Sequence, residues 1–194
     1  MTKYVIGLVA LILLVASVGS YNGLVKLSQA VDSSWAQVET QYQRRLDLIP
    51  NLVSTVKGEA DFEKSTLTDV VNARAKATSI TVDANTVNNP QQFAKYQQAQ
   101  SELGSTLSRL MMVSERYPDL KSNQQFAQLM DELAGTENRI ATSRRDYNNN
   151  VQQYNTTVQT LPTLIMARIG GFTIKPYFQA DAQANVAPSV DFSK

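Results

Sequence analysis

The feature that most constrains this chain is an apolar block at its start, where no charged residue occurs between Lys3 and Lys26. The 22 uncharged residues from Tyr4 to Val25 include the run YVIGLVALILLVASV. As one helix they would extend roughly 33 Å, enough to cross a bilayer core of ~30 Å. We therefore expect residues 1–25 to be a transmembrane anchor that is retained, with residues 4–25 in contact with lipid.

A cleaved signal peptide is the alternative interpretation of this block. Lys3 would supply its positive charge, and Ser17-Val18-Gly19 would supply a small-residue cleavage site. Two features favour the retained anchor. The site lacks the usual Ala-x-Ala form, and the apolar block leads into a helical pattern without a break. The chain contains no cysteine, which excludes a lipid-modified cysteine as the anchor.

The composition argues against several classes of function. About 170 of the 194 residues follow the anchor, which suits one domain with a sizeable core. The net charge is +1 and 18% of residues are charged, so nothing indicates a nucleic-acid partner. The absence of histidine and cysteine removes imidazole and thiol catalysis, disulfides and most zinc sites. No glycine-rich phosphate loop is present either. We expect no enzyme activity and no cofactor.

Beyond the anchor, seam residues recur at alternating steps of three and four, the period of helices that pack together. The first series contains Leu24, Ser28, Val31, Trp35, Val38, Tyr42, Arg45, Ile49, Leu52 and Val56; the second contains Val53, Val56, Ala60, Glu63, Leu67, Val70 and Arg74. Pro50 interrupts the first. We expect the helix to kink near it, or to break there and restart, because proline removes a hydrogen bond and clashes with the previous turn. Residues 78–88 are polar and β-branched and predict a loop.

Two further helices follow. Asn89 as N-cap and Pro90 at the first helical position predict the start of one, which ends before Tyr117. The next begins at Ser122 or Asn123 and keeps a 3.5-residue repeat for 36 residues, until Pro162 bounds or kinks it. Its seam is Phe126, Met130, Leu133, Glu137, Ile140, Arg144, Tyr147, Val151, Tyr154, Val158 and Leu161.

Four long antiparallel helices with short connections predict an all-α fold, a four-helix bundle over residues 26–162. Neither a proline nor a charge run separates the first helix from the anchor, so the two can form one helix. Residues 163–194 contain several glycines and prolines between short apolar pieces, and they predict a partly extended C-terminal tail.

Five charged residues occupy seam positions of these helices: Arg45, Glu63, Arg74, Glu137 and Arg144. Burying an ion is costly unless it is paired and hydrogen-bonded. We therefore predict that these side chains are largely inaccessible and form cross-helix pairs that fix the register. The alternative is a polar ligand site between helices; a metal site is disfavoured because bundle metal sites use histidine with the carboxylates. The amide tract from Asn148 to Gln153 is interpreted as a solvated helix face.

The tail carries five large apolar side chains, Ile169, Phe172, Ile174, Tyr177 and Phe178. Exposing so many on a monomer is unfavourable, and exposed apolar patches usually mark an interface. We predict that they form a contact between subunits of a homo-oligomer. Packing of the tail on its own bundle is the alternative, and Gly170-Gly171 supplies the turn that either arrangement needs.

Several motifs together resemble the LemA family. They are QRRLDLIPNLV at 43–53 with VKG at 56–58, ELAGTENRI at 132–140 with RRDYN at 144–148, and YPDLK at 117–121. The resemblance covers nearly the whole chain. It implies a bacterial membrane protein with one N-terminal transmembrane helix and a long helical bundle, for which no enzymatic activity is established. A relative in this family acts in magnetosome membrane formation, which implies membrane scaffolding.

These observations lead to one functional hypothesis and one alternative. The hypothesis is a non-enzymatic, membrane-anchored scaffold that self-associates at a bacterial membrane and organises or remodels it. The alternative is an adaptor or sensor that binds another envelope protein, such as a protease or signalling protein. We expect a single-pass protein of the inner membrane with its bundle outside the cytoplasm, although the charges flanking the anchor do not decide the orientation.

Overall fold

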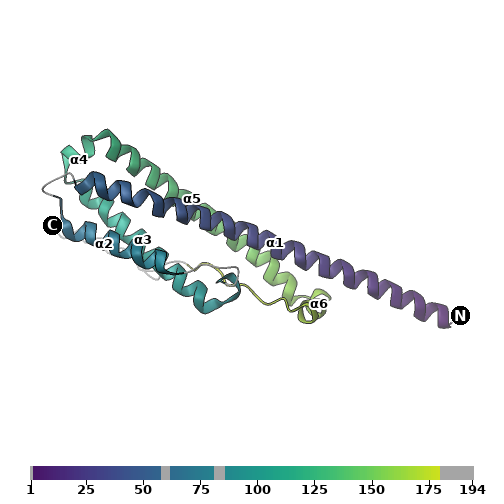
Figure 1. Cartoon of the computed structure of the whole chain (residues 1–194). Helices are drawn as coiled ribbons and strands as arrows, with labels where there is room; N and C mark the ends of the chain where they lie inside the picture. The colour runs from purple at the N-terminus through teal and green to yellow at the C-terminus, as the bar shows by residue number, and fades with distance from the viewer. Residues whose placement is uncertain (1, 58–61, 81–85, 180–194) are drawn as a thin grey trace, which may run out of the picture.

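A computed structural model describes residues 2–57, 62–80 and 86–179 of the chain. All regular structure in these ranges is helical. The elements are α1 (Thr2–Lys57), α2 (Lys64–Ser79), the 3-10 turn η1 (Thr86–Asn88), α3 (Pro90–Ser114), α4 (Pro118–Ser122), α5 (Gln124–Gln159) and α6 (Thr163–Gly170). Figure 1 shows α1, α2, α3 and α5 side by side, with the start of α1 projecting alone beyond the others. The all-helical prediction is confirmed.

The helix starts follow local chemistry. The Asn89 side chain accepts hydrogen bonds from the backbone N–H groups of residues 91 and 92, and Pro90 takes the first position of α3. The Asn123 side chain does the same for residues 125 and 126 at the start of α5. Gly171, at φ 72°, ends α6 in a left-handed conformation that favours glycine. The Asn89 cap lies where the sequence predicts it, and α5 begins at one of the two positions expected for its start.

α1 is one unbroken helix of 56 residues. Its large apolar side chains from Tyr4 to Val18 are 50–85% exposed, whereas from Leu24 onward one face is buried. Among the described helices it is the one long and apolar enough to cross a membrane. The expected apolar N-terminal helix is therefore present, and it runs into the helical domain without interruption (Figure 1).

A break at Pro50, one of the two outcomes expected there, does not occur, because α1 runs through this residue. Proline lacks the N–H that would donate to the carbonyl four residues earlier, which is that of Leu46. The Nε of Arg74, on α2, donates to this carbonyl at 3.2 Å. The helix therefore continues through the proline with the freed carbonyl satisfied from outside.

The chain does break later than expected. α1 ends at Lys57 and α2 begins at Lys64, so the series expected to run from Val53 to Arg74 is divided between two helices. Residues 58–61 of that series, residues 81–85 of the expected loop and residues 180–194 of the expected tail lie outside the described residues. In the described part of the tail, Thr163–Gly170 form α6 and residues 172–179 carry no helix.

The core consists of two apolar clusters along the long axis. α1 packs mainly on α5, and α2 mainly on α3. The cluster far from the N-terminus includes Ile49, Leu52, Val70, Leu107, Leu110 and Leu133. The cluster nearer the N-terminus includes Leu24, Trp35, Phe93, Tyr147, Tyr154 and Phe178. In the second, the Trp35 ring centroid lies 5.6–6.0 Å from those of four aromatic neighbours.

Candidate functional site

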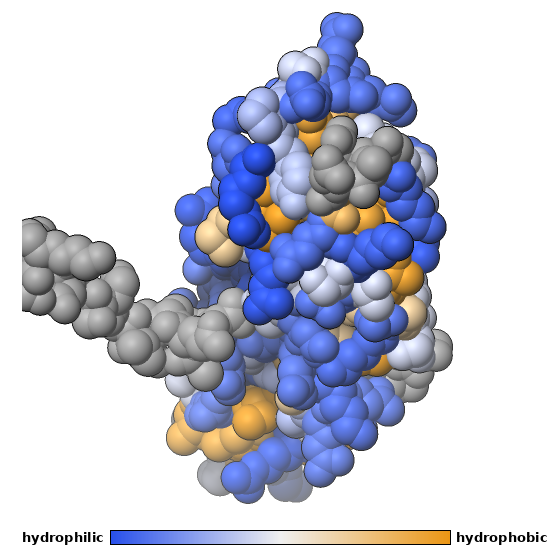
Figure 2. Space-filling model, turned by 90° about the vertical axis from the view of Figure 1, so that its left-hand side faces the viewer, coloured by the Kyte–Doolittle hydropathy of each residue, from blue (hydrophilic) through white to orange (hydrophobic). Residues whose placement is uncertain are grey.

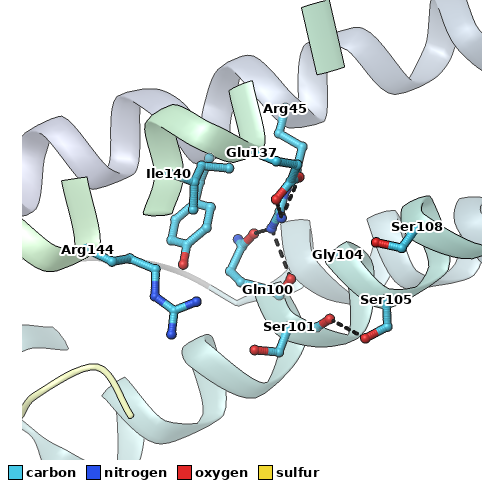
Figure 3. Close-up of a pocket in the computed structure, with 10 residues that line it drawn as sticks. Arg45, Gln100, Ser101, Gly104, Ser105, Ser108, Glu137, Ile140 and Arg144 are labelled. Atoms are coloured by element: carbon cyan, nitrogen blue, oxygen red, sulfur yellow. Dashed lines mark hydrogen bonds and ion pairs between the residues drawn. The ribbon is translucent and has the colours of Figure 1, made fainter. Parts of the chain in front are cut away.

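A buried polar layer separates the two clusters. Arg45 of α1 is 2% exposed, and its Nη1 lies 3.0 Å and 3.3 Å from the two carboxylate oxygens of Glu137 on α5. Its Nη2 donates to the backbone carbonyl of Gln100 on α3, at 3.0 Å, and to the side-chain oxygen of the same residue. Figure 3 shows this guanidinium reaching from one helix to two others. One cation therefore ties three helices together at a single level.

The neighbours of Arg45 explain why a charge is tolerated there. Its guanidinium lies over the Tyr42 ring at 5.0 Å, and Gln100 is itself only 2% exposed. A buried guanidinium is stabilised when a carboxylate and further acceptors bind it, as they do here at Nη1 and Nη2. The Arg45 Nε is buried without an acceptor among the described residues. Shifting α1 by one turn would separate Arg45 from both partners, so the layer fixes the register of α1 against α3 and α5.

An open groove of about 370 Å³ lies beside this layer. Small side chains of α3 form one wall, as Figure 3 shows, and Glu137 and Arg144 lie on the α5 side. At Gly104 an added Cβ would lie 3.4 Å from Arg45 Nη1, so glycine at this position avoids a close contact with the guanidinium. Within the described residues, no group of three or more acidic side chains is placed to hold a metal ion.

The structure brings together two of the five seam charges, Arg45 and Glu137. Arg74 is half-buried and donates to a backbone carbonyl, and Arg144 is half-buried against the tail. Among the described residues, neither arginine has an acidic side chain within ion-pair distance. The core position assigned to Glu63 is wrong. The chain break before α2 makes Glu63 its N-cap, where the side chain is 49% exposed and lies 3.7 Å from Arg116.

After α6 the chain runs extended along α5. The Asn155 side chain accepts from the backbone N–H of Lys175 at 2.8 Å and donates to its carbonyl at 2.9 Å. Asn148 binds the N–H and carbonyl of Phe178 in the same way, at 2.9 Å and 3.0 Å. Seven residues of helix rise ~10.5 Å and three extended residues span ~10 Å, so the two spacings match. We call residues 172–179 the strap.

Tyrosine hydroxyls add to the attachment of the strap. Tyr154 donates to the Thr173 carbonyl at 2.9 Å and Tyr147 to the Pro176 carbonyl at 3.1 Å. Burial, with a smaller contribution from the nearby Asp32 carboxylate, raises the pKa of both phenols. They therefore stay neutral and able to donate. The solvated-face interpretation of the amide tract is wrong for Asn148, which faces the strap.

Two side chains of the strap are buried. Lys175 is 5% exposed, and its Nζ lies 2.7 Å from the Asp32 carboxylate and 5.3 Å from the centre of the Tyr154 ring. Phe178 packs against Trp35, with ring centroids 6.0 Å apart. Sequence reasoning missed the pair of Lys175 and Asp32, because the extended strap carries no periodic signal that would mark one of its residues as buried.

The apolar tail residues predicted as a subunit contact divide into two groups. Phe178 is buried in the aromatic cluster, and Phe172 is partly buried with its ring 5.6 Å from that of Tyr21. The structure thus assigns these two to packing within the chain. Ile169, Ile174 and Tyr177 are 74%, 61% and 42% exposed. These three remain on the surface.

Comparison with known proteins places this architecture in a family. Residues 34–192, a range that contains the arginine layer and the strap, match the sequence profile of the LemA family. The chain belongs to the LemA family. It is 29% identical over 175 residues to magnetosome protein MamQ 2 of Paramagnetospirillum magneticum, covering 82% of this chain and 64% of the relative. It is 24% identical over 151 residues to protein LemA of Metamycoplasma hominis, covering 78% and 65%.

A third relative is magnetosome protein MamQ of Magnetospirillum gryphiswaldense, 26% identical over 174 residues. The aligned part of this LemA protein spans just under two thirds of the length of these curated relatives. Together with the exposed apolar stretch of α1, the family and its magnetosome members indicate a membrane-associated protein.

Proposed function

We propose that this LemA protein is a non-enzymatic scaffold, anchored in a bacterial membrane by α1, that self-associates and organises that membrane. The observation that carries the proposal is the continuity of α1, whose first part is apolar and exposed and whose second part lies in the core. At 1.5 Å per residue the whole helix is ~84 Å long, of which ~33 Å suffices for the bilayer. The remainder is built into the helical domain, which we interpret as a four-helix bundle.

A continuous helix couples the bundle rigidly to the bilayer. A flexible linker would let each domain tumble, whereas a helical connection holds all copies in one orientation. Anchoring in one plane also raises the effective concentration of neighbouring copies. Weak contacts between bundles are then sufficient for assembly, which supports a scaffold role.

The outer face of the strap is our candidate for the contact between copies. Ile174 and Tyr177 point away from the bundle while Lys175 and Phe178 point into it. Deleting the tail would be an ambiguous test, because it would also uncover the aromatic cluster. The double variant Ile174→Ser/Tyr177→Ser leaves the buried side chains in place.

Particle size in mild detergent tests self-association. We expect the full-length protein to form a large, homogeneous particle, and the strap variant to form smaller ones. Val71→Ser is the matched control, since Val71 is an exposed apolar residue (46%) on α2. Equal particle sizes for the strap variant and the unchanged protein would exclude this face as the contact.

Membrane insertion and orientation need separate measurements. We expect the full-length protein to stay in the inner-membrane fraction after carbonate washing, and a C-terminal alkaline phosphatase fusion to be active, which places the bundle outside the cytoplasm. A mature N-terminus near Ser20, found by mass spectrometry, would show instead that the apolar block is a cleaved signal.

An adaptor for another envelope protein is the second candidate. A groove of about 840 Å³ is lined by α1, η1 and the start of the strap, and Asp32, Glu39 and Lys175 give it both signs of charge. Such a groove suits a polar peptide segment of a partner. A photo-cross-linker at Ala36, an exposed residue of its wall, would capture that partner, and a monomeric particle in detergent would favour this role over the scaffold.

A further inference from the structure

Exposed apolar side chains gather at the end of the bundle that carries the anchor. Outside α1, the large apolar side chains that are exposed include Leu161 (72%), Ile165 (56%) and Ile169 (74%). Ile165 and Ile169 are four residues apart on α6 and therefore share one face. Figure 2 views the opposite end of the molecule, where hydrophilic residues cover most of the surface and apolar ones form separate patches.

Contacts with α1 fix the level of α6 along the anchor. The inner face of α6 packs through Ala167, which is 1% exposed, in the cluster that contains Leu24. A Cβ added at Gly170 would lie 3.2 Å from the Tyr21 ring. Leu24 and Tyr21 belong to the last turns of the uncharged stretch, just before Lys26. α6 therefore lies beside the point where α1 leaves the bilayer.

The charges near α6 suit a lipid surface. The first acidic residue of the chain is Asp32, and none occurs between Asp146 and Asp181. Lys26 and Arg168 are both exposed at this level. Basic side chains flanking an apolar face are typical of helices that lie in the headgroup region of anionic membranes.

We infer that α6 is a second membrane contact, a short helix whose Ile165 and Ile169 side chains, together with Leu161 just before the helix, enter the boundary between headgroups and acyl chains. The inference rests on the proposed anchoring of α1 and deepens it. The inner face of α6 is held by α1, and Gly171 turns the chain back towards the bundle at its end. Lipid is assigned as the occupant because α6 lies against the apolar end of the anchor, where Tyr21, 43% exposed, lies beside Gly170.

Single-cysteine labelling tests this in the full-length protein, because the chain contains no cysteine of its own. Ile165→Cys and Ile169→Cys would each carry a polarity-sensitive fluorophore in vesicles of phosphatidylcholine and phosphatidylglycerol. Leu11→Cys, in the anchor, reports insertion of α1. Met112→Cys is the control for an exposed apolar residue (69%) far from the anchor. Circular dichroism checks that each variant keeps its helix content.

We expect the labels at Leu11, Ile165 and Ile169 to emit at shorter wavelength than the Met112 label and to lose intensity when the acyl chains are brominated. A Leu11 label unaffected by brominated lipid would refute the anchor and with it the proposed function. A quenched Leu11 label with Ile165 as water-exposed as Met112 would overturn the α6 contact alone. An Ile165 label shielded from soluble iodide but not quenched by lipid would show a protein neighbour instead, and would also overturn it.

Discussion

Pro50 and Arg74 provide a sharp test of how α1 stays continuous. Arg74 Nε donates at 3.2 Å to the Leu46 carbonyl, the acceptor that Pro50 leaves without its helical donor. Arg74→Met keeps the aliphatic stem and removes the donor. A hydrogen bond from a charged group contributes about 1.5–3 kcal/mol. Because Arg74 is half-buried and water can replace part of the bond, we expect a loss of about 1.5 kcal/mol in the free energy of unfolding.

Pro50→Ala should make the hydrogen bond from Arg74 to the Leu46 carbonyl dispensable. Alanine restores the backbone N–H, which donates to the Leu46 carbonyl, and the side chain at position 50 is exposed, so the core is unchanged. Alanine is favoured over proline by up to about 3 kcal/mol in a helix interior. We expect a gain of about 1–2 kcal/mol, since the protein already accommodates the proline. In that background Arg74→Met should cost less than about 0.5 kcal/mol, as for an ordinary surface change.

The assay is guanidinium unfolding of the full-length protein in mild detergent. The single tryptophan, Trp35, reports on it because the ring is buried among other aromatic side chains. Arg109→Met is the control, an exposed arginine whose partner, Asp69, is exposed too. The four variants of the cycle should show a coupling of about 1 kcal/mol between positions 50 and 74. If Arg74→Met costs the same in both backgrounds, the carbonyl is not what Arg74 satisfies.

Four further substitutions test the same structure. Glu137→Ala should lower the free energy of unfolding by about 2–3 kcal/mol because it strands the buried guanidinium of Arg45. Arg45→Met should lower it less, since the Glu137 side chain that it leaves unpaired is 32% exposed and can reach water. Equal losses for the two variants would contradict this explanation. Asn148→Ala should make the strap sensitive to limited proteolysis by freeing the backbone of Phe178, and unchanged cleavage would argue against the amide clamp. Burial raises the pKa of the Glu39 carboxyl. The free energy of unfolding should therefore fall as the pH rises from the ordinary pKa of a carboxyl group through the raised pKa of Glu39. Glu39→Gln should abolish this dependence when unfolding is measured against pH.

The sequence predicts those parts of the fold that depend on local chemistry and periodicity. The cap at Asn89, the start of α5 and its long repeat involve neighbouring residues only, and each lies where expected. The course of the chain around Pro50 could not be predicted in this way. Whether a proline breaks a helix depends on whether the freed carbonyl finds a donor, and that donor, Arg74, belongs to another helix.

The candidate site could likewise be predicted from the sequence only in part. Arg45 stands out in sequence as a charge at a core position, so its burial is inferable, but its pairing with Glu137 needs the relative register of two helices. Nothing in the tail distinguishes Lys175 as buried. Asn148 lies in an amide-rich tract that resembles a solvated face, and only the extended strap beside it gives that amide a backbone to bind.

The polar contacts of α1 explain why this helix can serve as the axis of the molecule. Along its length Asp32 binds the strap, Arg45 binds α3 and α5, and the Leu46 carbonyl binds α2. Each contact is specific to one partner, so sliding α1 by a turn would leave buried charges and a carbonyl unsatisfied, whereas purely apolar contacts would re-form in the new register. Because the same helix provides the proposed anchor, every other element is positioned relative to the membrane through these contacts. Fixing the register of α1 would therefore also set the depth at which α6 makes its proposed contact with the bilayer.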